Sequence, residues 1–153
     1  MKQNRQKIKL ENNEIEFHKE DDVLWFCQLD RGNSLFEITI DTEKYYTDVD
    51  WEKIEKIANH FIESEESYVK MCSEPLKMLA KTTALFTDEQ VTYGKFLIAG
   101  LEILDNSLFA NENSWKFELR FEFDGTENLI DPYGLWIVTF DGKCIIGVRR
   151  EEQ

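Results

Sequence analysis

The sequence predicts an α+β fold, in which two helices pack on one face of a mainly antiparallel sheet. Three observations lead to this prediction: apolar and polar residues alternate near the start, a helical period replaces the alternation in the middle, and the alternation then returns. The predicted order is therefore strands, helices, strands. Because a chain of 153 residues typically builds one core, we expect a single domain over residues 1–153.

The first forty residues predict an antiparallel meander. Apolar residues alternate with polar ones in 8–10 and in 15–17, on either side of an Asn-Asn pair that suits a hairpin turn. Two longer alternating runs follow at 23–29 and 35–40, and turn-forming residues separate them. We expect these four strands to pair in sequence order.

The middle of the chain predicts helix. Apolar residues recur at spacings of three and four from Trp51 to Ile62, which is typical of an amphipathic helix. A second helical stretch covers about residues 67–81. Pro75 interrupts it, and because proline suits a first helical turn better than an interior, the pattern predicts two helices or one broken helix.

Residues 96–104 are apolar without a clear period, so strand and helix both remain open for them. The glycine at position 100 and the strands that follow favour strand. We therefore expect another buried strand here, between the helices and the last part of the chain.

The last part of the chain predicts three strands. From Trp115 to Phe123 large apolar residues occupy every second position, while charged residues such as Glu118 and Arg120 occupy the others. Cross-strand ion pairs are the expected role of these charges. Runs at 135–140 and 144–148 flank Asp-Gly, a dipeptide that favours a type I′ hairpin turn.

The net charge is −13, and the acidity is greater in the body of the chain. The first ten residues contain four basic and no acidic residues, so residues 11–153 carry −17. Such a field disfavours binding to nucleic acid or to a membrane surface and favours basic protein partners. Solubility is the alternative interpretation of the same charge.

The cysteines indicate a reducing compartment. Cys27, Cys72 and Cys144 are odd in number, far apart and flanked by apolar residues, which suits reduced core thiols better than disulfides or a zinc site. We find no apolar run of signal-peptide or membrane-spanning length. We therefore expect a cytoplasmic protein.

No reactive motif is visible. The two histidines, His18 and His60, fall in no known catalytic pattern and are interpreted as a loop residue and a helix-packing residue. Acid clusters at 20–22 and 124–131 lack the spacing of a calcium loop, and zinc and phosphate-binding motifs are absent. We predict no catalytic residue, no metal ligand and no cofactor.

Two surface features could serve protein recognition. Adjacent tyrosines lie among acids before the first helix, and a Pro-Tyr-Gly loop precedes the strand at 135–140. Acids gather near the middle of the helical region and in the loop after residue 123. The predicted partner-binding residues are Tyr45, Tyr46, Glu63, Glu65, Glu66, Asp124, Glu127, Asp131 and Tyr133.

In size, acidity, element order, aromatic content and the run over residues 131–138, the chain resembles small acidic bacterial immunity proteins and related uncharacterised domains. The resemblance implies a protein that neutralises a toxin by tight binding. Our expectation is a non-enzymatic, acidic protein-binding domain that inhibits a basic toxin.

The alternative is a small-molecule-binding or enzymatic domain with a pocket between sheet and helices, using Tyr133, His60 or Cys72. A mimic of nucleic acid ranks last, because the acids are clustered and not evenly spaced. The oligomeric state is left open by the sequence.

Overall fold

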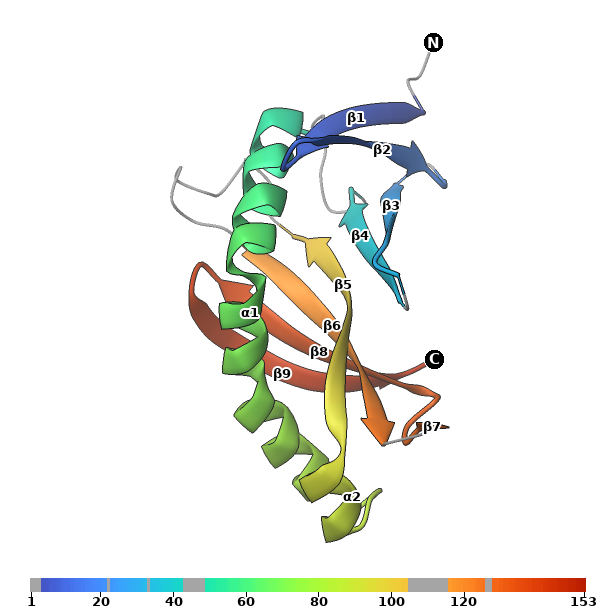
Figure 1. Ribbon diagram of the computed structural model, residues 1–153, viewed down its shortest axis with the longest axis vertical. Helices are drawn as coiled ribbons and strands as arrows, with labels where there is room; N and C mark the ends of the chain where they lie inside the picture. Colours follow the sequence, from blue (N-terminus) through green and yellow to red (C-terminus); the bar gives the residue numbers. More distant parts are fainter. Residues whose placement is uncertain (1–3, 22, 33, 43–48, 105–115, 126–127) are drawn as a thin grey trace.

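The computed structural model describes residues 4–21, 23–32, 34–42, 49–104, 116–125 and 128–153. Within these residues the fold is α+β, with one mostly antiparallel sheet and helices in the middle of the chain (Figure 1). The elements are β1 Arg5–Leu10, β2 Asn13–Lys19, β3 Leu24–Asp30, β4 Leu35–Asp41, α1 Trp51–Thr82, α2 Asp88–Tyr93, β5 Lys95–Ile103, β6 Lys116–Gly125, β7 Asn128–Leu129, β8 Gly134–Asp141 and β9 Cys144–Glu152.

The described strands form a single sheet that is larger than the sequence suggested. Its order is β1-β2-β3-β4-β5-β6-β8-β9, and the short β7 pairs with β6. All neighbouring strands are antiparallel except β4 and β5, which are parallel. The parallel pair follows from the connection, because the helices between β4 and β5 return the chain to the same end of the sheet.

Helix α1 crosses one face of the sheet, from the β2 side to β8. Its first residue, Trp51, contacts Phe17 of β2 and Trp25 of β3 with ring centroids 5.4 and 4.9 Å apart. Further along the helix, the Tyr68 ring lies 5.1 Å from that of Phe140 in β8. One helix therefore joins both ends of the sheet through a continuous aromatic layer.

The predicted inward faces of the strands are confirmed. In β6 the alternating side chains Phe117, Leu119, Phe121 and Phe123 are at most 1% exposed, and in β4 the inward residues are at most 2% exposed. These side chains meet the buried stripe of α1. That stripe consists of Ile54, Ile57, Ala58, Phe61, Tyr68, Cys72, Leu76 and Ala80.

The predicted break at Pro75 is wrong, because α1 runs through it as one helix of 32 residues. Proline has no N–H to donate to the carbonyl of Met71, a residue that is 41% exposed. The buried stripe continues on both sides through Cys72 and Leu76, each 0% exposed. Burial of this stripe outweighs the cost of the proline.

The second helix of the structure is one that the sequence analysis did not predict. Helix α2 begins after Thr87, whose hydroxyl accepts a hydrogen bond from the Gln90 N–H at 3.1 Å. In return the Gln90 side chain accepts one from the Thr87 N–H at 2.9 Å. This reciprocal pair is a capping box, and it stabilises a helix of only six residues.

The strand prediction for residues 96–104 is confirmed by β5, which bulges between Ile98 and Gly100. A Cβ at Gly100 would lie 2.8 Å from the Glu37 carbonyl oxygen of β4, so the close approach of these strands requires glycine. The predicted last hairpin is also present. Its turn is shifted by one residue, since Asp141 pairs with Cys144 and Gly142 takes the first turn position with φ 61°.

The three cysteines are free thiols, and two of them lie in the core as predicted. Cys144 is exposed, because it begins the edge strand β9, and its prediction as a core thiol is wrong. Burial raises the pKa of Cys27 to about 11 and that of Cys72 to about 12.

We therefore expect a thiol reagent to modify Cys144 alone in the folded protein, because the thiolate is the reactive species and the other two thiols are buried. Counting modified thiols by mass spectrometry tests this, with the urea-unfolded protein, in which all three react, as control. Rapid labelling of Cys27 or Cys72 before unfolding would contradict the buried placement.

Candidate functional site

A groove of about 610 Å³ runs along the outer side of the first half of α1. It lies on the opposite side of the helix from the residues that face the sheet, Ile54, Ile57 and Phe61. The described residues that line it are Glu52, Glu55, Lys56, Asn59, His60 and Glu63.

The local sequence determines where α1 begins, and this start sets which residues line the groove. The Asp50 side chain accepts a hydrogen bond from the Lys53 N–H at 3.2 Å and so caps the first turn. From that start, residues three and four apart fall on one side of the helix. The glutamates at positions 52, 55 and 63 thereby share the groove.

Asn59 connects the groove-lining side of α1 to the β1–β2 hairpin. Its Nδ2 donates to the carbonyls of Lys9 and Glu55, each at 2.8 Å, and its Oδ1 accepts from the Glu11 N–H at 2.8 Å. Glu11 lies in the β1–β2 turn with φ 56°. Asn59 therefore ties the helix to this turn and sets the position of the groove wall.

His60 is held by a second polar contact. Its Nε2 lies 2.7 Å from the hydroxyl oxygen of Tyr68, which is 3% exposed, and the rings meet edge to face. Burial lowers the pKa of His60 and the nearby charge of Lys143 lowers it further, whereas the groove carboxylate Glu63 acts in the opposite direction. The net lowering favours the neutral imidazole, which adds no positive charge to the groove.

The groove is acidic, with three carboxylates and one ammonium among the side chains that line it. Within the described residues, no ion pair involves Glu52, Glu55 or Glu63. These carboxylates also carry no hydrogen bond to a described cation. The groove thus presents negative charge that the described part of the chain does not neutralise.

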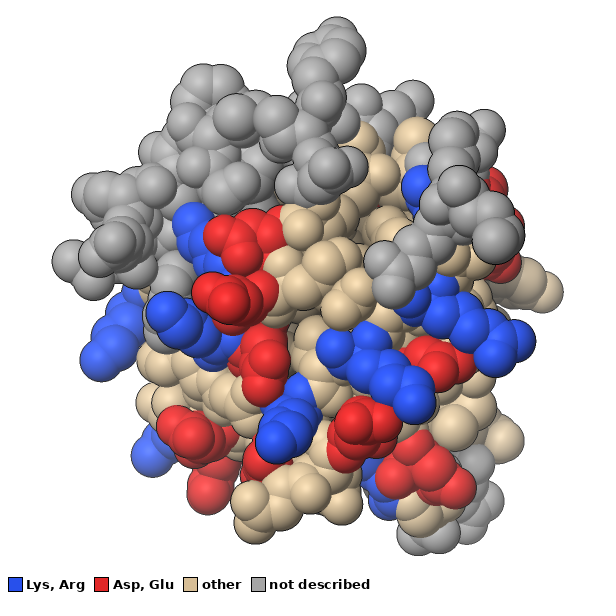
Figure 2. Space-filling model, turned by 90° about the horizontal axis from the view of Figure 1, so that it is seen from above, with Lys and Arg blue, Asp and Glu red and all other residues tan. Residues whose placement is uncertain are grey.

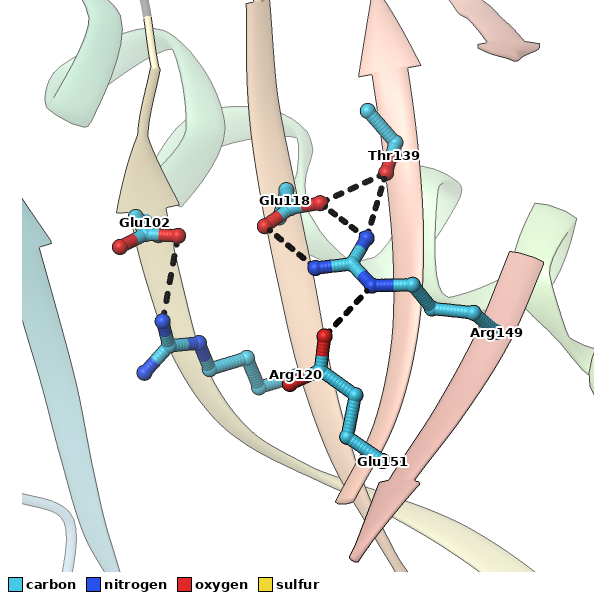
Figure 3. A network of polar contacts seen from close by, with 6 residues as sticks. All are labelled: Glu102, Glu118, Arg120, Thr139, Arg149 and Glu151. Atoms are coloured by element: carbon cyan, nitrogen blue, oxygen red, sulfur yellow. Dashed lines mark hydrogen bonds and ion pairs between the residues drawn. The ribbon is translucent and has the colours of Figure 1, made fainter. Parts of the chain in front are cut away.

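Unlike the carboxylates of the groove, the acids on the outer face of the sheet pair with arginines (Figure 3). Arg149 donates from Nη2 to Oε1 of Glu118 at 3.1 Å and from Nη1 to its Oε2, while Thr139 donates to Oε2 at 2.8 Å. Arg120 pairs with Glu102 at 3.1 Å. The predicted cross-strand ion pairs are confirmed at these positions.

This network is nearly neutral and partly desolvated. Burial raises the pKa of Glu102; for Glu118 burial acts in the same direction, but hydrogen bonds from Arg149 and Thr139 outweigh it and lower the pKa. Ile137 lies in register between Arg120 and Arg149 and is 2% exposed. Because the arginines neutralise the acids here, this face is a structural layer.

A third group of acids lies where β6, β7 and β8 meet. Asp131 is 7% exposed, and its carboxylate accepts from Arg150 Nε at 2.7 Å, from Arg150 Nη2 at 3.0 Å and from Trp136 Nε1 at 3.0 Å. Asp131 therefore stabilises the fold through these contacts, and its predicted role in partner binding stays a prediction. Tyr133, by contrast, is 70% exposed.

The predicted partner-binding residues fall into separate groups. Glu63 lines the groove and Glu66 is exposed beside it, whereas Glu65 forms an ion pair with Arg31, whose guanidinium lies 4.0 Å from the Phe36 ring centre. Asp124, Asp131 and Tyr133 belong to the β6–β8 corner, away from the middle of α1 (Figure 1). Tyr45, Tyr46 and Glu127 lie outside the described residues.

Most of the groove was missed by sequence reasoning, although the signal was present. Glu52, Glu55, Lys56 and Asn59 repeat at helical spacing on the side opposite the apolar stripe. The sequence alternative of a pocket between sheet and helices does not match this groove, which lies on the outer side of α1. Of its three residues only His60 lines the groove, and Cys72 is 0% exposed.

The acidity does not form an even coat over the molecule. Figure 2, which looks onto the β1–β2 end, shows basic and acidic side chains mixed on that face. On this hairpin Lys7 lies 3.2 Å from Glu14 and Arg5 lies 3.8 Å from Glu16. The acidic groove therefore differs from a surface on which opposite charges are interspersed.

The described part of the chain shows neither a metal-binding cluster nor a helix suited to a membrane. No group of three or more His, Cys, Asp or Glu side chains there could hold a metal ion. None of the helices in those residues combines the length and apolar character that a membrane span requires.

No protein-family model matches the sequence, and no curated protein or solved structure is significantly similar to the chain.

Proposed function

We propose that this chain is a non-enzymatic protein-binding domain and that the acidic groove of α1 takes up a basic segment of another protein. The observation that carries the proposal is the set of three groove carboxylates, Glu52, Glu55 and Glu63, which have no cationic partner among the described residues. A guanidinium or ammonium group would supply that partner.

The groove is suited to a long cationic side chain. Carboxylates on successive turns of one helix accept hydrogen bonds from a planar guanidinium, while the alkyl parts of Glu55 and Lys56 contact its stem. Asn59 fixes the groove wall against the β1–β2 turn, so little order is lost when a ligand binds. The neutral His60 does not compete for the carboxylates.

The charge of the whole chain supports a basic protein as the partner. The net charge of −17 on residues 11–153 accelerates encounter with a basic surface and repels nucleic acid and anionic lipid. The finer proposal is a cytoplasmic inhibitor of a basic toxin, of the kind that the resemblance to immunity proteins implies. Capture of a basic protein from the source cell, reversed by salt, would identify that partner.

A binding measurement on the purified chain tests the groove. We expect a fluorescein-labelled arginine-rich peptide to bind the wild type and to bind Glu55→Gln/Glu63→Gln about fivefold to tenfold more weakly, since each exposed ion pair contributes up to about 1 kcal/mol. Fluorescence anisotropy titrations give the dissociation constants. Affinity should fall as the salt concentration rises.

The matched control is Glu20→Gln/Glu89→Gln, which removes the same charge from exposed positions outside the groove. General attraction to an acidic protein would weaken binding equally in both variants. Equal losses would therefore contradict the groove proposal, and affinity independent of salt would contradict the charged contact itself.

A further inference from the structure

The outer side of α1 changes the sign of its charge near its middle. Residues on this side lie in one straight row, because they follow one another at spacings of three and four. The first half of the row is acidic on balance, and the second half is basic. From start to end the row reads Glu52, Lys56, Asn59, Glu63, Ser67, Lys70, Glu74, Met78 and Lys81.

The second half of the row also exposes large apolar side chains. Met78 of the row is 66% exposed, and Met71, which lies beside the row next to Lys70, is 41% exposed. Within the described residues, no ion pair involves Lys70 or Lys81. The exposed face thus combines methionines with unneutralised lysines.

We infer that a second copy of this chain docks on the outer side of α1, with the two helices antiparallel. The inference follows from the spacing of the charges. Counted from a centre between Glu66 and Ser67, Glu63 lies as far back as Lys70 lies forward, and Glu52 lies as far back as Lys81 lies forward. In an antiparallel pair each glutamate therefore meets the second copy's lysine.

The remaining charges of the row are not matched in this register. Lys56 lies opposite the second copy's Lys77, and the nearest acid of the row is Glu74, one turn away. Two-fold symmetry doubles the matched glutamate–lysine contacts, because each pair occurs once from each copy. A parallel pair would place glutamate against glutamate and lysine against lysine, and would also align the helix dipoles unfavourably.

The apolar contact falls in the acidic groove. In this register Met78 of one copy lies over Glu55 and Lys56 of the other, whose alkyl stems line the groove. A flexible methionine suits such an irregular surface. The interface therefore covers exposed apolar area as well as pairing charge.

The contact is expected to be weak. A helix of 32 residues is about 48 Å long at 1.5 Å per residue, and a single helix pair buries less surface than a standard protein interface. We therefore expect a dimer that forms at high protein concentration and dissociates as salt is added.

This inference does not rest on the proposed function, because it needs only the charges and spacing of α1. It does predict that self-association and binding of a basic ligand compete, since the second copy covers the groove. Lys70 and Lys81 lie outside the groove, so changing them separates self-association from binding of a basic ligand.

Sedimentation velocity tests the dimer with complementary charge reversals. We expect wild type to dimerise at low salt, and Glu52→Lys/Glu63→Lys and Lys70→Glu/Lys81→Glu each to be monomeric alone, because every interfacial pair then carries like charges. An equimolar mixture of the two variants should form a heterodimer, because mixing restores all four pairs. Lys95→Glu/Lys116→Glu, which reverses exposed charges on strands, should dimerise as wild type does.

Three results would overturn the inference: a wild-type chain that stays monomeric at about 1 mM and low salt, a dimer that both charge-reversed variants retain, or a variant mixture that fails to associate. The arginine-rich peptide separates this failure from that of the proposed function. Lys70→Glu/Lys81→Glu leaves the groove intact, so it should bind the peptide at least as tightly as wild type even though it no longer dimerises.

Discussion

Replacing Phe61 with alanine is expected to lower the free energy of unfolding by about 3–5 kcal/mol. Phe61 is 0% exposed and lies where α1 crosses the centre of the sheet. Its ring stacks on that of Phe36 at 5.9 Å and also contacts those of Tyr68 and Phe117 at 6.1 and 6.2 Å. Truncation removes these contacts and leaves a cavity that rigid neighbours fill only in part.

Chemical denaturation followed by tryptophan fluorescence measures the loss, provided that the denaturant slope is unchanged. Leu85→Ala is the control, because Leu85 is 56% exposed and its truncation should cost less than about 0.5 kcal/mol. A loss below about 1 kcal/mol for Phe61→Ala would show that α1 does not pack on the sheet as described.

Replacing Asp131 with alanine is expected to cost a similar amount, about 3–5 kcal/mol, for a different reason. The carboxylate accepts hydrogen bonds from Arg150 and from the indole N–H of Trp136. Trp136 is 0% exposed and the Arg150 side chain is 13% exposed. Alanine would leave a mostly buried guanidinium and a buried indole N–H without their partner.

The same residue gives a pH dependence with a definite sign. Hydrogen bonds from Arg150 hold the pKa of Asp131 below its usual value of 3.8, against the opposing effect of burial. A lowered pKa in the folded state gives stability that is fully present above pH 3.8 and is lost as the pH falls below it. The stability difference between wild type and Asp131→Ala should therefore shrink in that acidic range.

Thermal or denaturant unfolding at a series of pH values measures this difference. Asp131→Asn keeps the shape and can still accept hydrogen bonds, but it has no charge to titrate. We expect Asp131→Asn to be less destabilised than Asp131→Ala near pH 7. The difference in stability between these two variants should not shrink as the pH falls below 3.8. A difference between wild type and Asp131→Ala that stays constant from pH 7 to below pH 3.8 would contradict the role of the ionised carboxylate.

The strands could be predicted from the sequence because one buried face imposes a period of two. Phe117, Leu119, Phe121 and Phe123 alternate with charged residues, and the structure places all four in the core. β5 was located differently, from an apolar run without a clear period in which Gly100 favours strand, and the last hairpin from two runs that flank Asp-Gly. The turn of that hairpin was shifted by one residue because Asp141 pairs with Cys144, which only the register of the two strands shows.

Helix boundaries were less predictable, because tertiary burial overrides local preference. Pro75 predicts a break, yet the stripe through Cys72 and Leu76 is buried against the sheet and keeps the helix continuous. For α2 the local signal existed, since Thr87 and Gln90 have the spacing of a capping box. That short helix was missed because only Val91 of its residues is buried.

The site could be predicted only in part. Glu63 was predicted as a binding residue and lines the groove, but Asp131 was grouped with it on charge alone. Its partner Arg150 lies 19 positions away and meets it only in the folded sheet. Charge in a sequence does not distinguish a neutralised acid from a free one, whereas the structure separates the arginine-paired acids of the sheet from the groove.

The central claim is that the α1 groove binds a cationic protein segment. An NMR titration of the ¹⁵N-labelled chain with the arginine-rich peptide, at a concentration where the protein is monomeric, tests it most directly. The account predicts that backbone shift changes concentrate on residues 52–63 and that Glu55→Gln/Glu63→Gln reduces them. Changes confined to the β6–β8 corner around Asp124 and Tyr133, with none along α1, would contradict it.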